Sequence, residues 1–371
     1  MNGKQNLMER RVGRRDFLKL SAKTAAVLGL SPTIIPTLCS AFEKKDKPAV
    51  IWVHFQECTG CTESLLRATE PDLSDLIFDV ISLEYHETLF AAAGHQIEES
   101  LEHAMKRYTD QYLLVVEGSI PSKDGGVYCK IGGHTAIDIL HKTAKHAAAI
   151  ISIGSCASWG GIASAGYNPT GAQGVTKTLK HLNLKKPVIN IPGCPPNPHN
   201  FLSTVVHYLT YGLPKLDSEN RPTFAYGTLI HDQCERRGHF DSGRFAESFG
   251  DEGHRKGYCL YKLGCKGPST YGNCSEQGFN AEKKWPVSIG HPCIGCIESK
   301  VGFKQSMYDL SEMLHIANPS QLYPRPVHPQ NKGISPVATG VAGAAIGSVG
   351  TMAILKSLTL KNTEEEYHEE E

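Results

Sequence analysis

The stretch that decides the fold runs from residue 49 to residue 61 and reads AVIWVHFQECTGC. Its first part, Ala49 to Phe55, is a short and mostly apolar run, which predicts a strand of a parallel sheet buried on both faces. Directly after this run, Cys58 and Cys61 stand at C-x2-C spacing on a Thr-Gly turn. Because ligands of open α/β sheets bind beyond the carboxyl ends of the strands, this turn is a candidate ligand site.

Similar apolar runs return along the chain, with helix-like segments between them. The further strand candidates are Leu76–Leu83, Tyr112–Val116, Ala148–Ile153 and Val188–Ile191. The helix candidates are Ile97–Arg107, His134–His146 and Ala172–His181. Alternating strands and helices predict a doubly wound α/β domain, and we expect a flavodoxin-like strand order over residues 48–215.

From about residue 220 the sequence changes character. Gly, Pro, Cys, Ser and Asn crowd residues 220–325, and long periodic segments are missing. A segment of this kind has a small core of its own, and bound metal clusters could supply the missing stability. We therefore expect a second, cluster-rich domain with little regular secondary structure.

The charges exclude one class of function. Lys and Arg together number 38, as do Asp and Glu, and aromatic residues make up only 8% of the chain. Since the sequence has no basic stripe, we expect no nucleic acid among its partners.

The N-terminus predicts an export signal. Arg14 and Arg15 precede a mildly apolar stretch from Leu20 to Leu38, which is the pattern of a twin-arginine signal with cleavage near Ala41. We assign residues 1–41 to this signal. The twin-arginine route moves folded, cofactor-loaded proteins, which favours metal ligation over a disulfide framework for the cysteines. Cys39 leaves with the signal.

The C-terminus predicts a membrane anchor. Residues 333–355 contain no charged side chain and exceed the ~20 residues that a membrane-spanning helix needs. Gly343 and Gly347 form a GxxxG pair that permits close packing on another membrane helix. A flexible tail rich in Gly and Ala is the alternative. Residues 356–371 form a tail that ends in acidic residues.

Four cysteines follow predicted strands and form the first candidate site. They are Cys58, Cys61, Cys156 and Cys194. If the loops after these strands converge on one edge of the sheet, four thiolates meet, which suits a cubane 4Fe–4S cluster. Four buried free cysteines are the alternative.

Two more groups lie in the second domain. The first comprises His231, Cys234, Cys259 and Cys265. The other comprises Cys274, Cys293 and Cys296. Histidine can replace cysteine on iron, and three cysteines suit a 3Fe–4S cluster. A structural zinc, or a disulfide plus a free thiol, is the alternative for the three-cysteine group, and Cys129 is left over as a structural residue.

Several blocks of this sequence resemble those of nickel–iron hydrogenase small subunits, in the same order over residues 48–330. They are ECTGC at 57–61, VEGSIP at 116–121, GSCA at 154–157, PGCPP at 192–196, WPV at 285–287 and GHPCIGC at 290–296. The signal and the anchor are similar to those of the membrane-bound uptake group. The resemblance implies two 4Fe–4S clusters and one 3Fe–4S cluster that carry electrons.

The same resemblance implies a role for each group. The first group would hold the proximal 4Fe–4S cluster, the three-cysteine group the medial 3Fe–4S cluster, and the His231 group the distal 4Fe–4S cluster. Pro286 would stand where the medial cluster lacks a fourth ligand. Oxygen-tolerant relatives carry extra cysteines at positions that correspond to Gly60 and Gly161, so this chain resembles the oxygen-sensitive type. In the family, the position that corresponds to Glu57 has been linked to proton exit. The alternative interpretation, an ordinary carboxylate at a subunit interface, has equal support.

The resemblance also implies partners and a location. Hydrogen would be oxidised at the NiFe site of a large subunit, so no catalytic residue is expected in this chain. Electrons would pass to a membrane cytochrome b and on to quinone, at the periplasmic face of the cytoplasmic membrane, from a heterodimer or a higher oligomer of heterodimers. Two alternatives stay open: an iron–sulfur relay subunit of a related quinone-linked oxidoreductase, and a secreted disulfide-stabilised binding protein.

Overall fold

The computed structural model describes residues 47–68, 80–279 and 283–311, all within one compact unit, Met1–Asn318. In this described part, no helix combines the length and the apolar character needed to cross a membrane. The predicted signal at 1–41, the anchor at 333–355 and the tail at 356–371 lie outside the described residues.

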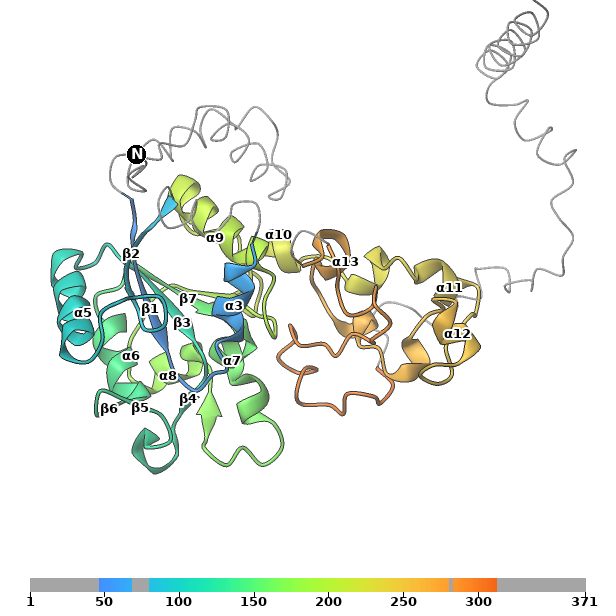
Figure 1. Cartoon of the computed structure of the whole chain (residues 1–371), viewed down its shortest axis with the longest axis horizontal. Helices are drawn as coiled ribbons and strands as arrows, with labels where there is room; N and C mark the ends of the chain where they lie inside the picture. The colour runs from blue at the N-terminus through green and yellow to red at the C-terminus, as the bar shows by residue number, and fades with distance from the viewer. Residues whose placement is uncertain (1–46, 69–79, 280–282, 312–371) are drawn as a thin grey trace, which may run out of the picture. The chain divides into compact units, whose positions relative to one another are not determined.

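A five-stranded parallel sheet forms the centre of the first part of the chain (Figure 1). Its strands, in spatial order, are β2 (Ser82–His86), β1 (Ala49–His54), β3 (Leu113–Glu117), β7 (Ala149–Ile153) and β9 (Val188–Ile191). Renumbered by their order along the chain, these strands lie 2-1-3-4-5, which is the flavodoxin-like order. The predicted fold class of this domain is confirmed. Every residue of β1, β3, β7 and β9 is buried, as the continuous apolar runs predicted.

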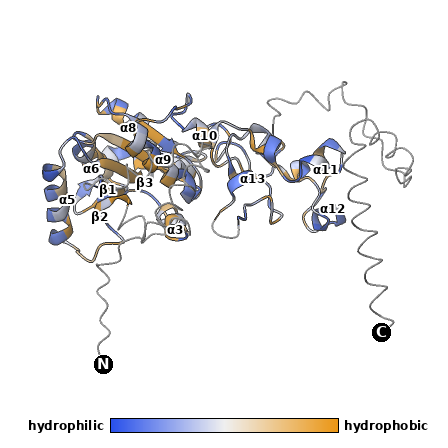
Figure 2. Cartoon of the chain, turned by 90° about the horizontal axis from the view of Figure 1, so that it is seen from above, coloured by the Kyte–Doolittle hydropathy of each residue, from blue (hydrophilic) through white to orange (hydrophobic). Residues whose placement is uncertain are grey.

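Helices cover both faces of this sheet. On one face α5 (His95–Arg107), α6 (Ala136–Ala144) and α8 (Val175–His181) pack against alternate strand residues such as Ile51 and Leu114. On the other face α3 (Gly60–Leu66) and α9 (Pro198–Tyr211) pack against the intervening residues, including Trp52 and Val115. The strands carry mostly hydrophobic colours in Figure 2, whereas α5 is largely hydrophilic on its outer side.

Two predicted elements differ from the structure. Of the strand expected at Leu76–Leu83, residues 76–79 lie outside the described residues, and the described strand is β2, Ser82–His86, whose first three residues are only partly buried. An edge strand has one neighbour, so it alternates polar and apolar residues and escapes a search for apolar runs. The helix expected from Ala172 begins at Val175, because Ala172–Gln173 forms a short strand, β8, antiparallel to β4 (Ile120–Pro121).

The remaining elements of this part are short. They are η4 (Lys123–Gly126), β5 (Lys130–Ile131), β6 (His134–Thr135), α7 (Gly154–Trp159) and η5 (Gly161–Ser164). The helix predicted from His134 starts two residues later, because Thr135 and Asp138 form a capping box at its beginning.

The second part has little regular structure, as predicted. Its elements are α10 (Thr223–Tyr226), η6 (Ile230–Gln233), α11 (Arg237–Asp241), α12 (Glu252–Arg255), η7 (Tyr261–Leu263), η8 (Gly267–Ser269) and α13 (Cys274–Gln277). Leu260, Trp285 and Val287 from this part belong to the same hydrophobic cluster as Trp52 and Phe201. The core on this face of the sheet therefore continues into the second part.

Candidate metal centres

The first four predicted ligands come together at the carboxyl edge of the sheet. Cys58 and Cys61 follow β1, Cys156 lies in α7 after β7, and Cys194 follows β9. Burial, followed by Glu117 and the other three thiols, raises the pKa of Cys61 well above its usual value. Burial, and next Cys194, raises the pKa of Cys156 to about 11. These mutual influences show that the four sulfurs share one location.

Glycines leave room around these sulfurs. A Cβ atom on Gly161 would lie 2.6 Å from the Sγ of Cys156, and one on Gly60 would lie 3.1 Å from the Sγ of Cys58. A Cβ on Gly154, whose φ is +84°, would overlap the Sγ of Cys61. Close backbone approach lets N–H groups reach the sulfurs of a bound cluster, so the site fits a 4Fe–4S group.

Glu117, at the end of β3, fixes the turn that carries two of these cysteines. Its Oε1 accepts hydrogen bonds from the backbone N–H of Cys61 at 3.0 Å and of Thr62 at 3.2 Å. Its Oε2 accepts from Thr62 Oγ1 at 2.6 Å and from Trp52 Nε1 at 3.2 Å. The residue is only 1% exposed. Sequence reasoning noticed the VEGSIP block but missed this anchoring role.

A histidine–carboxylate group adjoins this anchor. His54 Nδ1 lies 3.5 Å from Glu57 Oε1 and 3.8 Å from Glu117 Oε2. Both ring nitrogens of His54 lack a hydrogen-bond partner among the described residues. However, the four donors on Glu117 already occupy its lone pairs, so this trio is poorly suited to hold a cation of its own.

The three cysteines of the second-domain group line one cavity of about 580 Å³. Burial, and next Cys293, raises the pKa of Cys274 to about 12. Burial, then Cys274, then Cys194, raises the pKa of Cys296 to about 12. Pro286 lines the same cavity. Three thiols in a roomy apolar cavity fit a 3Fe–4S group.

The histidine group lines a separate, enclosed cavity. His231, Cys234, Cys259 and Cys265 all face it. Burial, and next Arg237, lowers the pKa of His231 to about 4, which leaves the ring neutral and able to bind metal. The buried Nε2 of His231 has no hydrogen-bond partner among the described residues. The donor set therefore fits iron.

No disulfide forms among the described cysteines. All eleven are free, including Cys129, which packs beside the core formed by α5 and α6. Burial, and next Glu87, raises the pKa of Cys129 to about 11, as suits a structural thiol. The alternative of a disulfide-stabilised binding protein is not supported.

The fold and these sites define an α/β protein with a flavodoxin-like sheet and three groups of candidate metal ligands. Comparison with known proteins gives its family. Residues 58–208 match the family described as "NADH ubiquinone oxidoreductase, 20 Kd subunit". Residues 226–309 match the C-terminal family of the "NiFe/NiFeSe hydrogenase small subunit".

Relatives with similar sequences carry consistent names. The Hydrogenase-2 small chain of Escherichia coli (strain K12) is 53% identical over 351 residues, which cover 93% of this chain and 92% of the relative. The quinone-reactive Ni/Fe-hydrogenase small chain of Wolinella succinogenes is 51% identical, over 79% of this chain and 82% of its own length. A solved [NiFeSe] hydrogenase from Desulfovibrio vulgaris Hildenborough superposes with a TM-score of 0.65 at 37% identity, over 69% of this chain and 95% of that one.

The chain belongs to the family of nickel–iron hydrogenase small subunits, which are electron-transfer subunits that carry iron–sulfur clusters and pair with a NiFe large subunit. The alternative of a different quinone-linked enzyme is not supported. The match that is specific to hydrogenase small subunits covers both the His231 group and the Cys274 group.

Proposed function

We propose that this chain transfers electrons from hydrogen oxidation in its large subunit, by way of three iron–sulfur clusters, to a membrane cytochrome b and then to quinone. The proximal 4Fe–4S cluster is assigned to Cys58, Cys61, Cys156 and Cys194. The medial 3Fe–4S cluster is assigned to Cys274, Cys293 and Cys296. The distal 4Fe–4S cluster is assigned to His231, Cys234, Cys259 and Cys265. When bound, such clusters supply reversible one-electron transfer.

The observation that carries this proposal is the closeness of each ligand group to the next. Cys194 of the proximal group lines the same cavity as the three medial cysteines. Lys266, the neighbour of Cys265 in the distal group, donates its N–H to the carbonyl of Cys293 in the medial group at 2.7 Å. The medial cysteines therefore neighbour both other groups, which is the arrangement that a linear relay needs.

The chain's own residues prepare these sites in two ways. Burial raises the pKa of the thiols, so each site favours protonated cysteines until a metal displaces the protons. The exposed Cys58 and Cys194 open the proximal site to the surface, where we place the large subunit. Gly60 and Gly161 stand against Cys58 and Cys156, which supports the assignment to the oxygen-sensitive type.

The location belongs to the same proposal. We propose that residues 1–41 direct twin-arginine export, that residues 48–215 and 220–325 form the two cluster domains, and that residues 333–355 anchor the complex at the periplasmic face of the membrane. The uncharged stretch at 333–355 supports the anchor. The quinone-reactive name of the Wolinella succinogenes relative supports a cytochrome b partner and quinone as acceptor.

The test is metal analysis and spectroscopy of the complex purified with its large subunit. We expect about eleven iron atoms in this chain, from two 4Fe–4S clusters and one 3Fe–4S cluster, and hydrogen-dependent reduction of a dye. Electron paramagnetic resonance (EPR) of the oxidised complex should show a 3Fe–4S signal. A fully loaded complex with about eight iron atoms and no such signal would contradict the medial assignment.

A further inference from the structure

The loops that carry the proximal and medial cysteines are joined by a set of buried hydrogen bonds. Ser155, the neighbour of Cys156, donates its hydroxyl proton to the carbonyl of Cys296. The same hydroxyl oxygen accepts the N–H of Gly193 at 3.0 Å, and the Ser155 N–H returns a bond to the Gly193 carbonyl at 2.9 Å. Cys194, the next residue along the chain, lines the same cavity as Cys296.

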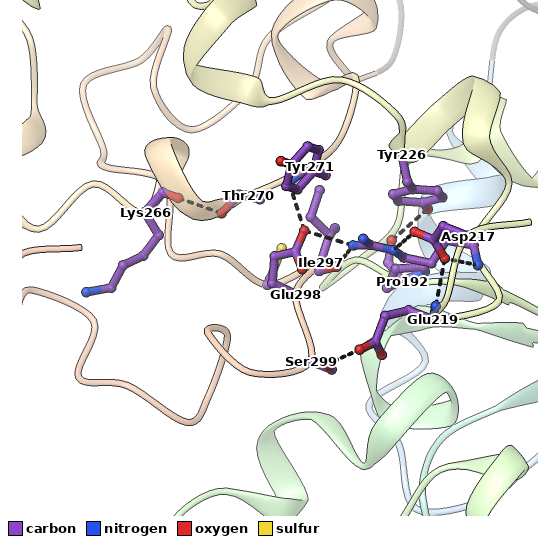
Figure 3. A network of polar contacts seen from close by, with 12 residues as sticks. Pro192, Asp217, Glu219, Tyr226, Lys266, Thr270, Tyr271, Ile297, Glu298 and Ser299 are labelled. Atoms are coloured by element: carbon purple, nitrogen blue, oxygen red, sulfur yellow. Dashed lines mark hydrogen bonds and ion pairs between the residues drawn. The ribbon is translucent and has the colours of Figure 1, made fainter. Parts of the chain in front are cut away.

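A second set of contacts holds the same two loops from another side (Figure 3). Tyr226 donates its hydroxyl proton to the carbonyl of Pro192 at 2.9 Å. The Arg221 guanidinium lies over the Tyr226 ring, 5.6 Å from its centroid. Arg221 also donates to the carbonyl of Ile297 at 2.8 Å and to Glu298 at 2.9 Å. The loop at 192–194 and the loop at 296–298 therefore cannot shift independently.

We propose that Ser155 is a positioning residue for electron transfer between the proximal and medial ligand groups. Its hydroxyl joins the Cys296 carbonyl to the N–H of Gly193, and this holds the backbone at Cys194 beside the backbone at Cys296. The result is a bonded route from two proximal ligands to one medial ligand. The inference rests on the proposed function. Along this route one electron leaves the proximal group, which is oxidised, and enters the medial group, which is reduced, while no bond breaks and no proton moves.

Ser155 differs from an ordinary buried serine because its hydrogen bonds influence the reduction potential of the medial cluster. Hydrogen bonds to ligand sulfurs help to set the potential of an iron–sulfur cluster. The Ser155 hydroxyl keeps the backbone of residues 193–194 beside Cys296, and backbone N–H dipoles near a ligand sulfur stabilise added negative charge and so raise the medial potential. Loss of this hydroxyl frees the loop at 193–194 to move away from Cys296, which lowers that potential and lengthens the route.

The experiment compares three variants in the complete complex. Ser155→Ala removes the bridging hydroxyl, and Ser155→Thr retains it. Ser158→Ala is the matched control, because Ser158 is also buried in α7 but its hydroxyl donates only to Gly154 within the helix, at 2.9 Å. Iron content, the medial midpoint potential by EPR titration, and the rate of medial reduction after rapid photoreduction of the proximal site are measured in each.

We expect Ser155→Ala to keep its iron, lower the medial midpoint potential, and slow proximal-to-medial transfer about tenfold, as outer ligand partners commonly do when removed. Ser155→Thr should remain closer to the parent than Ser155→Ala, and Ser158→Ala should match the parent. If Ser155→Ala and Ser158→Ala have the same potential and the same rate, the inference is overturned.

The parent complex provides a test that does not depend on any variant folding. In complex grown in D₂O and labelled with ¹⁵N, pulsed EPR of the medial signal should detect a backbone amide nitrogen of residues 193–194 beside Cys296. A medial signal without this coupling overturns the inference, even where Ser155→Ala fails to hold iron. Absence of any medial signal in the fully loaded parent would instead contradict the proposed function.

Discussion

Replacement of Arg221 by methionine should loosen the loop that follows Cys296. The Arg221 side chain is 6% exposed and bonds Asp217 at 2.8 Å and Glu298 at 2.9 Å. Removal of one partner from a buried ion pair costs about 3–5 kcal/mol, because a buried charge is left unpaired. Here both carboxylates keep other donors: Asp217 accepts from the N–H of Glu219 at 2.9 Å, and Glu298 accepts from the N–H of Tyr271 at 2.8 Å. We therefore expect the lower end, about 3 kcal/mol.

For a chain of 371 residues the entropy of unfolding is about 0.8 kcal/mol/K, so about 3 kcal/mol corresponds to a fall of roughly 4 °C in the midpoint of thermal unfolding. The assay is heating of the purified complex while the EPR signals of the medial and proximal sites are recorded separately. The medial signal should vanish at the lower temperature, because Arg221 bonds the carbonyl that follows Cys296.

The control for this prediction is Arg237→Met. Arg237 also bonds two carboxylates, those of Asp232 and Asp241, but its partners are about half exposed. Exposed pairs contribute about 0–1 kcal/mol, so this variant should shift the midpoint by at most about 1 °C. Adding Glu298→Gln to Arg221→Met should recover part of the loss, since one unpaired charge is removed. Equal midpoints for the Arg221 and Arg237 variants would refute the reasoning.

Three further predictions concern the proposed sites and the proposed anchor. Cys293→Ser should abolish the 3Fe–4S signal and leave the proximal signal intact, and an unchanged medial signal would show that the grouping is wrong. Pro286→Cys adds a thiolate to the medial cavity and should convert the cluster toward a 4Fe–4S form with a lower potential, measured by iron content and redox titration. Parental iron content and spectrum would exclude Pro286 from the site. A stop codon after Gln330 should release a soluble complex that reduces dye with hydrogen but fails to reduce quinone, because residues 333–355 are absent. Loss of dye reduction in a correctly assembled truncated complex would refute the anchor.

The sheet was predictable from the sequence because each inner strand has a recognisable local sequence pattern. The strands β1, β3, β7 and β9 are buried on both faces, so their apolar runs are uninterrupted, and the cysteines after three of them point to the functional edge. The edge strand β2 was misplaced because it is only half buried. The helix α9, Pro198–Tyr211, was overlooked even though Asn197 caps it and Pro198 stands at its first position.

The partners that position the ligands could not be read from the sequence. Ser155 and Cys296 are 141 residues apart, and Arg221 and Glu298 are 77 apart. Pairings over such separations leave no periodic trace, because either residue alone resembles an ordinary serine or a surface charge. Glu117 was hidden for the same reason: its four hydrogen-bond donors come from strand β1 and helix α3 and are brought to it only by folding.

Residues at the boundary between the two proposed domains form contacts that hold the domains together. Residues 215–220 separate the domains in sequence, yet Asp217 and Arg221 at this crossing form the buried ion pair beside the medial loop. The hydrophobic cluster also continues from Trp52 in the sheet to Trp285 in the second part. A domain that contains mostly short helices therefore does not depend on metal alone for its stability, since it shares a core with the sheet. The same contacts hold the proximal and medial loops together. Substitutions at this crossing should therefore alter both metal sites. The medial site should change first, because it has less regular structure around it.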